Sequence, residues 1–223
     1  MPDDTAARLT RKGRATRARI VDAAAKLMFQ RGVAGTSIDE VRNVADVSGS
    51  QISHYFDDKR DLTRQVIAAR CTDVQEFHTQ PQFGGFDSLQ SLQTWADANI
   101  ADIDAVYRQG GCNYGSLAGE LTEADPEVHA DLAAGNERWL ELLRAGLTAM
   151  RSRGDLRPDA DPRHLAVSLV AAHQGGAILT YAMDDPEPLR AALNSAVEYV
   201  HSFAPAPKRR RSPARSSRRK PKS

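Results

Sequence analysis

Polar side chains that can hydrogen-bond to nucleic acid are concentrated in one stretch of the chain, residues 36–61. Gln51 carries a carboxamide, which can hold the edge of adenine through two hydrogen bonds. Lys59 stands near the expected start of a helix, where its charge and the free backbone N–H groups favour a phosphate. The stretch therefore predicts a DNA contact surface. Its predicted members are Thr36, Ser37, Ser48, Gly49, Ser50, Gln51, His54, Tyr55 and Lys59.

Several of these residues keep a second interpretation. His54 and Tyr55 could pack one helix onto another, Lys59 could be only a surface charge at a helix start, and Gln51 need not read a base. Asp57, Asp58 and Asp61 spell DDxxD, which resembles the magnesium motif of helical terpenoid synthases. Acidic residues at a helix start also complement its dipole, so we interpret them as capping residues. No catalytic residue, metal site or cofactor is predicted.

The spacing of apolar residues predicts helices throughout, with no period-2 alternation. Ser37 with Glu40 makes a capping box, and Ser48 caps the next short helix, with residues 45–47 as the turn. We expect a helix-turn-helix of which the second helix enters the major groove. Predicted helices cover residues 19–31, 37–45, 48–56, 58–77, 89–110, 115–121, 126–153, 162–183 and 186–202, with a loop at 79–87.

The charge is divided unevenly along the chain. Net charge is +4 for residues 1–71, −12 for residues 72–203 and +9 for residues 204–223. A basic front and tail suit a protein that meets nucleic acid only at its ends. The two cysteines make no disulfide framework or metal pattern, and neither a signal peptide nor a run of roughly 18 apolar residues is present. We therefore expect a soluble cytoplasmic protein, with no membrane partner.

The run IVDAAAKLMFQRGVAGTSIDEV…ADVSGSQISHYFDDKRDL resembles the N-terminal domain of TetR/AcrR-type transcriptional regulators. The segment GGCNYGSLAGEL, with the later Trp139, is similar to the C-terminal domain of the LmrA/YxaF-like branch. The resemblance implies an all-α fold: an N-terminal three-helix helix-turn-helix domain and a larger helical domain for ligand binding and dimerisation. The domains expected are a basic arm (1–15), a DNA-binding domain (16–64), a ligand-binding and dimerisation domain (65–203) and a disordered basic tail (204–223).

Three residues depart from the pattern of this family. Arg42 stands where a small alanine is usual, Asp46 replaces the turn glycine, and Ser53 replaces a phosphate-binding tyrosine. Aspartate tolerates positive φ better than most residues. Arg42 and Asp46, four residues apart, could form an ion pair across the turn. These departures do not change the expected fold, but they leave the detailed DNA contacts open.

The resemblance also implies a homodimer and a small-molecule effector. The helices at 162–183, apolar on nearly all sides, and at 186–202 supply the expected dimer surface. Aromatic and polar residues on apolar faces are candidates for the effector site; they are Trp95, Tyr107, Cys112, Asn113, Trp139, His173, Gln174 and Tyr181. The two tryptophans could equally be core residues, and His173 and Gln174 could be dimer contacts. No cation lies among them, so an apolar neutral or cationic effector is expected.

The function predicted is a ligand-responsive repressor released from a palindromic operator. One alternative is an architectural DNA-binding protein without effector, in which the tail KRRRSPARSSRRKPKS dominates through counterion release. That tail could also serve solubility or bind RNA or an acidic protein. A less expected alternative is a helical magnesium-dependent enzyme using the DDxxD motif.

Overall fold

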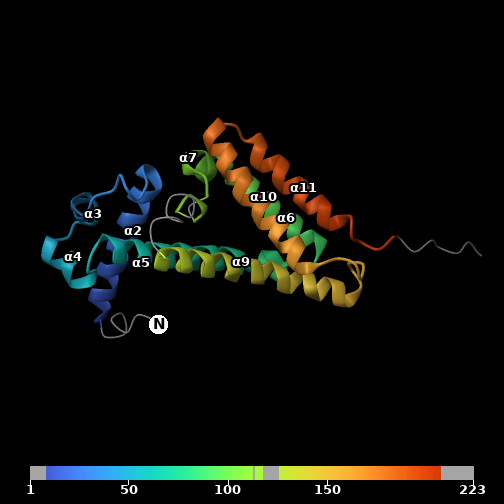
Figure 1. Cartoon of the computed structure of the whole chain (residues 1–223), viewed down its shortest axis with the longest axis horizontal. Coiled ribbons are helices and arrows are strands. Elements are labelled where there is room, and N and C mark those ends of the chain that lie inside the picture. Colours follow the sequence, from blue (N-terminus) through green and yellow to red (C-terminus); the bar gives the residue numbers. More distant parts are fainter. Residues whose placement is uncertain (1–8, 113, 118–125, 207–223) are drawn as a thin grey trace, which may run out of the picture.

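The computed structural model describes residues 9–112, 114–117 and 126–206, and every regular element in these ranges is a helix. Figure 1 shows the N-terminal helices gathered at one end, with long helices running side by side away from them. A pair of antiparallel helices closes the other end. The fold is all-α, as the sequence predicts. The predicted helix 115–121 and the tail fall largely outside the described residues.

The N-terminal end consists of α2 (Arg11–Arg31), α3 (Ile38–Ala45) and α4 (Gly49–Tyr55). Helix α2 begins eight residues before the predicted start at Arg19, because the Thr10 side chain accepts the N–H of Gly13 at 3.1 Å and caps it. Residues 11–15 are therefore helical and do not belong to a free arm. Ile20, Ala24 and Val41 form the centre of this small core.

The two long helices are α5 (Lys59–His78) and α9 (Pro126–Arg153), which pack against each other. Asp58 caps α5 by accepting the N–H of Asp61 at 2.8 Å. The start of α9 is tied to the first turns of α5 by Arg64, whose Nε lies 2.6 Å from Asp131 Oδ2 and whose Nη1 lies 2.8 Å from Glu127 Oε2. These ion pairs join the two helices next to the N-terminal end.

The segment between the long helices differs from the prediction in two places. The predicted loop contains a 3₁₀ helix, η1 (Pro81–Phe86), which buries Phe83 and Phe86. The predicted helix 89–110 is divided into α6 (Leu89–Ala101), a π-helical turn η2 (Ile103–Tyr107) and the short α7 (Arg108–Gly110). Periodicity alone did not show this division because one irregular turn changes the helix phase without removing the apolar stripe.

Helices α10 (Pro162–Met183) and α11 (Glu187–His201) form the far end. Gly176 allows their close approach: a Cβ there would lie 2.8 Å from Leu189 Cα. Gly175 has no such neighbour among the described residues. By length and composition α10 could also cross a membrane. In its most apolar stretch of 18 residues, 44% is buried. Because α9 and α11 pack against it, we interpret it as a core helix with one open face.

Candidate functional site

The turn between α3 and α4 has the left-handed conformation that the sequence predicts. Asp46 has φ 51° and ψ 60°, and its N–H donates to Asn43 O at 3.3 Å. The predicted ion pair with Arg42 is not the one observed. Arg42 Nη2 lies 3.6 Å from Asp39 Oδ1 instead, because Asp39 lies on the same helix face one turn earlier.

Helix α4 is fixed at its start by a capping box. Ser48 Oγ accepts the N–H of Gln51 at 3.2 Å, and Gln51 Oε1 accepts the N–H of Ser48 at 2.8 Å. Gly49, Ser50 and His54 are exposed on the same short helix. In the free protein the Gln51 side chain therefore caps a helix, which gives it a structural role beside its predicted contact with a base.

We expect two Gln51 variants to separate these roles. Gln51→Glu keeps an acceptor for the capping box but removes the donor that would bind adenine. It should leave the melting temperature nearly unchanged and alter operator preference. Gln51→Ala should lose part of the cap, about 0.5–1 kcal/mol, as well as the preference. Melting curves and binding to a randomised operator library measure both, and an unchanged preference in both variants would show that Gln51 reads no base.

The other predicted DNA contacts have different surroundings. Thr36 is only 2% exposed and its Oγ1 donates to Gly32 O at 2.9 Å. Its hydroxyl is therefore occupied by a hydrogen bond to the backbone at the end of α2. Ser37 is exposed and caps α3 in a capping box with Glu40. Tyr55 is half-buried against the start of α2, and Lys59 is the first residue of α5. Apart from Thr36, these side chains lie near the surface shared by α3, α4 and the start of α5.

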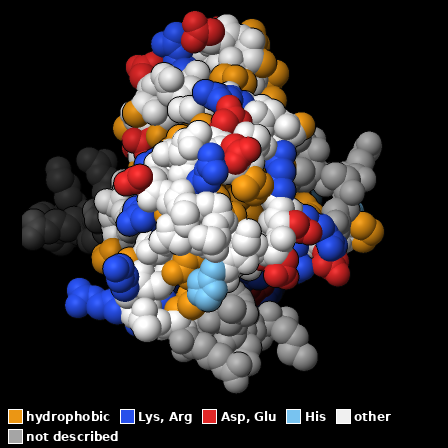
Figure 2. All heavy atoms as spheres, turned by 90° about the vertical axis from the view of Figure 1, so that its left-hand side faces the viewer, with side chains coloured by type: hydrophobic (Ala, Val, Ile, Leu, Met, Phe, Trp, Pro, Cys, Tyr) orange, Lys and Arg blue, Asp and Glu red, His pale blue; other side chains and the backbone are white. Residues whose placement is uncertain are grey.

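This end of the molecule faces the viewer in Figure 2. Lys and Arg side chains lie at several places on it among acidic ones, and uncharged side chains fill much of its centre. Three of the basic residues, Arg11, Lys12 and Arg14, are exposed in the first turn of α2. That turn lies beside α4, since a Cβ on Gly13 would be 3.5 Å from the Tyr55 hydroxyl. Basic side chains thus flank the exposed helix.

A cavity of about 150 Å³ lies in the larger part of the chain, between α5 and the helices that cover it. Four predicted effector residues line it: Tyr107 from η2, Cys112, Trp139 from α9 and His173 from α10. The lining residues that were not predicted from the sequence are Arg70, Asp73, Val74, Phe77, His78, Asn99, Asp102, Val106 and Tyr114. Five of these lie on α5, where the spacing from Arg70 through Val74 to His78 marks one helix face.

Hydrogen bonds link the side chains behind and around the cavity. The Tyr107 hydroxyl donates to Asn99 Oδ1 at 2.6 Å and lies 2.9 Å from His173 Nε2. Trp95 Nε1 donates to His78 Nε2 at 3.0 Å, and His78 Nδ1 lies 2.6 Å from Val74 O. Burial lowers the pKa of His78 to about 4 and that of His173 to about 3. Both imidazoles are therefore neutral near pH 7.

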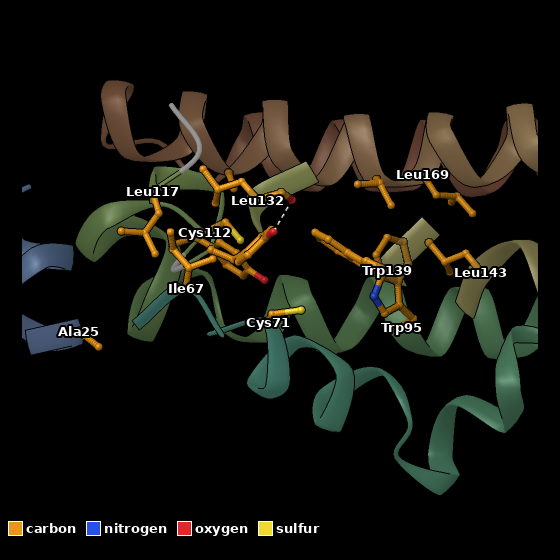
Figure 3. Packing of buried hydrophobic residues seen from close by; sticks show 14 of the residues in the cluster. Ala25, Ile67, Cys71, Trp95, Cys112, Leu117, Leu132, Trp139, Leu143 and Leu169 are labelled. Carbon is orange, nitrogen blue, oxygen red and sulfur yellow. Dashed lines mark hydrogen bonds between the residues drawn. The ribbon is translucent and has the colours of Figure 1, made fainter. Parts of the chain in front are cut away.

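The remaining effector candidates lie elsewhere. Trp95 is fully buried and donates to His78, so it supports the cavity wall without being part of it. Figure 3 shows Trp95 and Trp139 close together near Leu143. Gln174 lies beside Gly115 and the Cys112 thiol. Tyr181 is 52% exposed on the outer face of α10. Asn113 lies outside the described residues.

The DDxxD residues act as helix-start groups. Asp58 is the cap of α5, and the N–H of Asp57 donates to Asp61 Oδ2 at 3.3 Å. Both carboxylates therefore bind backbone N–H groups of this turn. This supports the capping interpretation over the magnesium motif.

These features define a class: a helix-turn-helix regulator with a separate helical domain around a small cavity. Two family models match the chain. "Bacterial regulatory proteins, tetR family" covers residues 20–66, and "Tetracyclin repressor-like, C-terminal domain" covers residues 88–196. The chain belongs to the TetR family of bacterial transcriptional regulators. The narrower likeness to the LmrA/YxaF-like branch stays a prediction.

The chain is also similar to individual transcriptional regulators. The chain is 23% identical to the HTH-type transcriptional repressor DhaR of Mycobacterium sp. (strain GP1) over 78% of this chain and 86% of that one. It is 24% identical to the transcriptional regulator AcuR of Cereibacter sphaeroides, over 82% and 80%. Among solved structures, a TetR transcriptional regulator from Chloroflexus aurantiacus J-10-FL has the same fold, with a TM-score of 0.74 and 24% identity, covering 87% of this chain and 98% of that chain.

Proposed function

We propose that this protein is a cytoplasmic repressor that leaves its DNA operator when a small apolar molecule occupies the cavity. One observation carries the proposal: a single helix, α5, joins the two sites. Its first residue, Lys59, lies beside α4, and its last turns supply Val74, Phe77 and His78 to the cavity wall. We call α2, α3 and α4 together the DNA-reading end. A ligand that moves the cavity wall would therefore tilt the same helix, α5, that carries this end.

The open face of α10 supports a homodimer through α10 and α11. Val167, Ile178, Leu179 and Met183 are all more than two-fifths exposed, and Tyr199 is similarly open on α11. Such a run of large apolar side chains is costly to leave in water. Two subunits joined there would present two copies of α4 to a pseudo-palindromic operator, whose half-sites must lie about 34–36 Å apart or a multiple of that.

A second route leads from the cavity to the DNA-reading end. Tyr107 lines the cavity, and three residues later Gly110 packs directly beneath Phe29 of α2. A Cβ on Gly110 would lie 2.5 Å from Phe29 Cζ. Because Gly110 and Phe29 are tightly packed, a ligand that moves Tyr107 would therefore also move α2.

Gly110→Ala should imitate the bound state because its methyl displaces the Phe29 ring. We expect weaker operator binding without any ligand, by about tenfold, corresponding to roughly 1.4 kcal/mol. Phe29→Leu combined with Gly110→Ala should restore part of the affinity, since the smaller side chain makes room. Operator titrations of the three proteins measure this, and equal affinity for wild type and Gly110→Ala would rule the route out.

The direct test uses purified full-length protein and DNA from the region upstream of its own gene. We expect a salt-sensitive, sequence-preferring shift that a small apolar compound reverses. A protein lacking residues 204–223 tests the architectural alternative. Retained, sequence-selective binding by the truncated protein supports the repressor, whereas complete loss would favour binding dominated by the tail. Absence of any sequence preference in the full chain would contradict the proposed function.

A further inference from the structure

Two buried polar atoms of the cavity wall have no hydrogen-bond partner among the residues that the structure describes. They are Nε1 of Trp139 and Nδ1 of His173. Trp139 is 1% exposed and His173 is 3% exposed, and both rings line the cavity. A buried polar group without a hydrogen bond is unfavourable, because it has lost its contacts with water. Such groups beside a cavity indicate that another molecule completes their hydrogen bonds.

The proton positions follow from the neighbouring contacts. Asn99 Nδ2 donates to Trp95 O at 2.7 Å, so Asn99 Oδ1 is the atom that faces His173 Nε2, at 3.1 Å. A carbonyl oxygen only accepts, so His173 Nε2 carries the proton and Nδ1 keeps its lone pair. Trp139 Nε1 can only donate. Among its described residues, the wall therefore presents Trp139 Nε1 as a free donor and His173 Nδ1 as a free acceptor.

The two atoms belong to neighbouring rings. The Trp139 and His173 rings have centroids 5.1 Å apart and are nearly perpendicular. A hydrogen bond to nitrogen is about 2.9 Å long, so a single oxygen placed between the two rings is the simplest partner for both nitrogen atoms. That oxygen must accept from Trp139 and donate to His173, which a hydroxyl group does and an ether, a halogen or a carboxylate does not.

The charges around the cavity favour an uncharged ligand. Arg70, its basic lining residue, is paired with Asp73 at 2.7 Å, so no free cation among the described lining residues awaits an anion. Asp102, the other acidic lining residue, is exposed, so its charge is solvated at the rim and is not a buried partner for a cation. A buried ammonium group would have to lie against the Trp139 N–H, whose hydrogen carries a partial positive charge and would repel it. His78 and His173 are neutral near pH 7. The cavity volume of about 150 Å³ is close to that of a cavity that accepts benzene.

We propose that the cavity binds a small uncharged alcohol or phenol whose hydroxyl group bridges Trp139 Nε1 and His173 Nδ1. The proposal rests on the proposed function and narrows its largely apolar effector to one that also carries a hydroxyl group. The body of the ligand, about the size of one benzene ring, packs against Phe77, Val106 and the aromatic walls. The hydroxyl group supplies the discrimination, because an apolar molecule of equal size would leave both nitrogen atoms unpaired.

The test compares phenol with toluene and fluorobenzene, which are similar in size but lack the hydroxyl donor. Binding to full-length protein is followed by calorimetry and by the fluorescence of the two tryptophans. We expect phenol to bind at least tenfold more tightly than either analogue, and benzyl alcohol more tightly than benzoate. Equal affinity for phenol and toluene would overturn the role of the hydroxyl group, tighter binding of benzoate would overturn the uncharged ligand, and no binding at all would overturn the site.

Two matched variants locate the donor. Trp139→Phe removes the free N–H, so the preference for phenol over toluene should fall severalfold. Trp95→Phe removes an N–H that is already bonded to His78 and frees only an acceptor, His78 Nε2, so the preference for phenol should not fall. Because the comparison within wild type needs neither variant, poor folding of one leaves the test intact. Operator release is measured separately: phenol that binds without releasing DNA contradicts the proposed function and leaves the ligand class standing.

Discussion

Ile178→Asp combined with Leu179→Asp should convert the protein into a folded monomer that barely binds its operator. Both side chains are about half exposed, at 52% and 51%, on the outer face of α10. In the dimer the four carboxylates of two subunits would lie in a desolvated apolar contact, where unpaired charges are strongly unfavourable. Within one subunit the exposed positions leave room for both substitutions.

The expected loss of DNA affinity follows from bivalency. Two linked reading ends bind a palindrome about 10²–10⁴-fold more tightly than one end alone. Sedimentation gives the mass of the variant, circular dichroism its helix content, and titration of a full operator its affinity. Ser152→Glu is the control, because it adds a negative charge at an exposed position of a different helix, α9. A double variant that stays dimeric would refute the interface at α10.

Gly146→Ala should destabilise the protein by about 3 kcal/mol or more, the upper part of the range for overpacked cores. Gly146 lies in α9 where η1 crosses it, and a Cβ there would overlap the carbonyl oxygens of Gly85 and Phe86. These are backbone atoms of a tight turn, with Gly85 at φ 67° and Phe86 at φ 60°, so they cannot rotate away as a side chain would. Either α9 or η1 must shift.

Urea unfolding of Gly146→Ala measures this cost. Ser152→Ala, on the exposed side of the same helix, should change stability by no more than about 0.5 kcal/mol. The loss is large compared with a total stability of about 5–15 kcal/mol. Near-wild-type stability of Gly146→Ala would mean that η1 does not pack against α9 as closely as the structure shows.

The helices and the turn of the DNA-reading end could be predicted well because their signals are local. Ser37 and Ser48 cap their helices through side chains three residues away, and Asp46 adopts the positive φ that its place in the turn requires. Each of these depends on residues within one or two turns of chain. The exceptions were Thr36, which is buried, and Arg42, which pairs with Asp39. Both depend on which way a side chain turns, and sequence spacing does not determine this.

The cavity could be predicted only in part. One helix, α10, carries His173, Gln174 and Tyr181 and is apolar on nearly every side. Its sequence pattern therefore does not show which face is buried. Eight residues of helix, the separation of His173 and Tyr181, turn by about 80° beyond two full turns. That rotation takes one side chain into the core and the other to the surface. Only the packing of α9 and α11 against α10 makes the choice.

By itself, the sequence determined that the chain is all-helical, that its first part is a helix-turn-helix, and that the family is that of TetR regulators. Capping, turn conformation and helix periodicity act between near neighbours, so they can be read along the chain. Tertiary structure alone decided which residues meet around the cavity, because Asn99, Trp139 and His173 come from three helices. Within the part of the chain that the structure describes, it also left one donor and one acceptor there unpaired, since hydrogen bonding between distant segments is completed only when they pack.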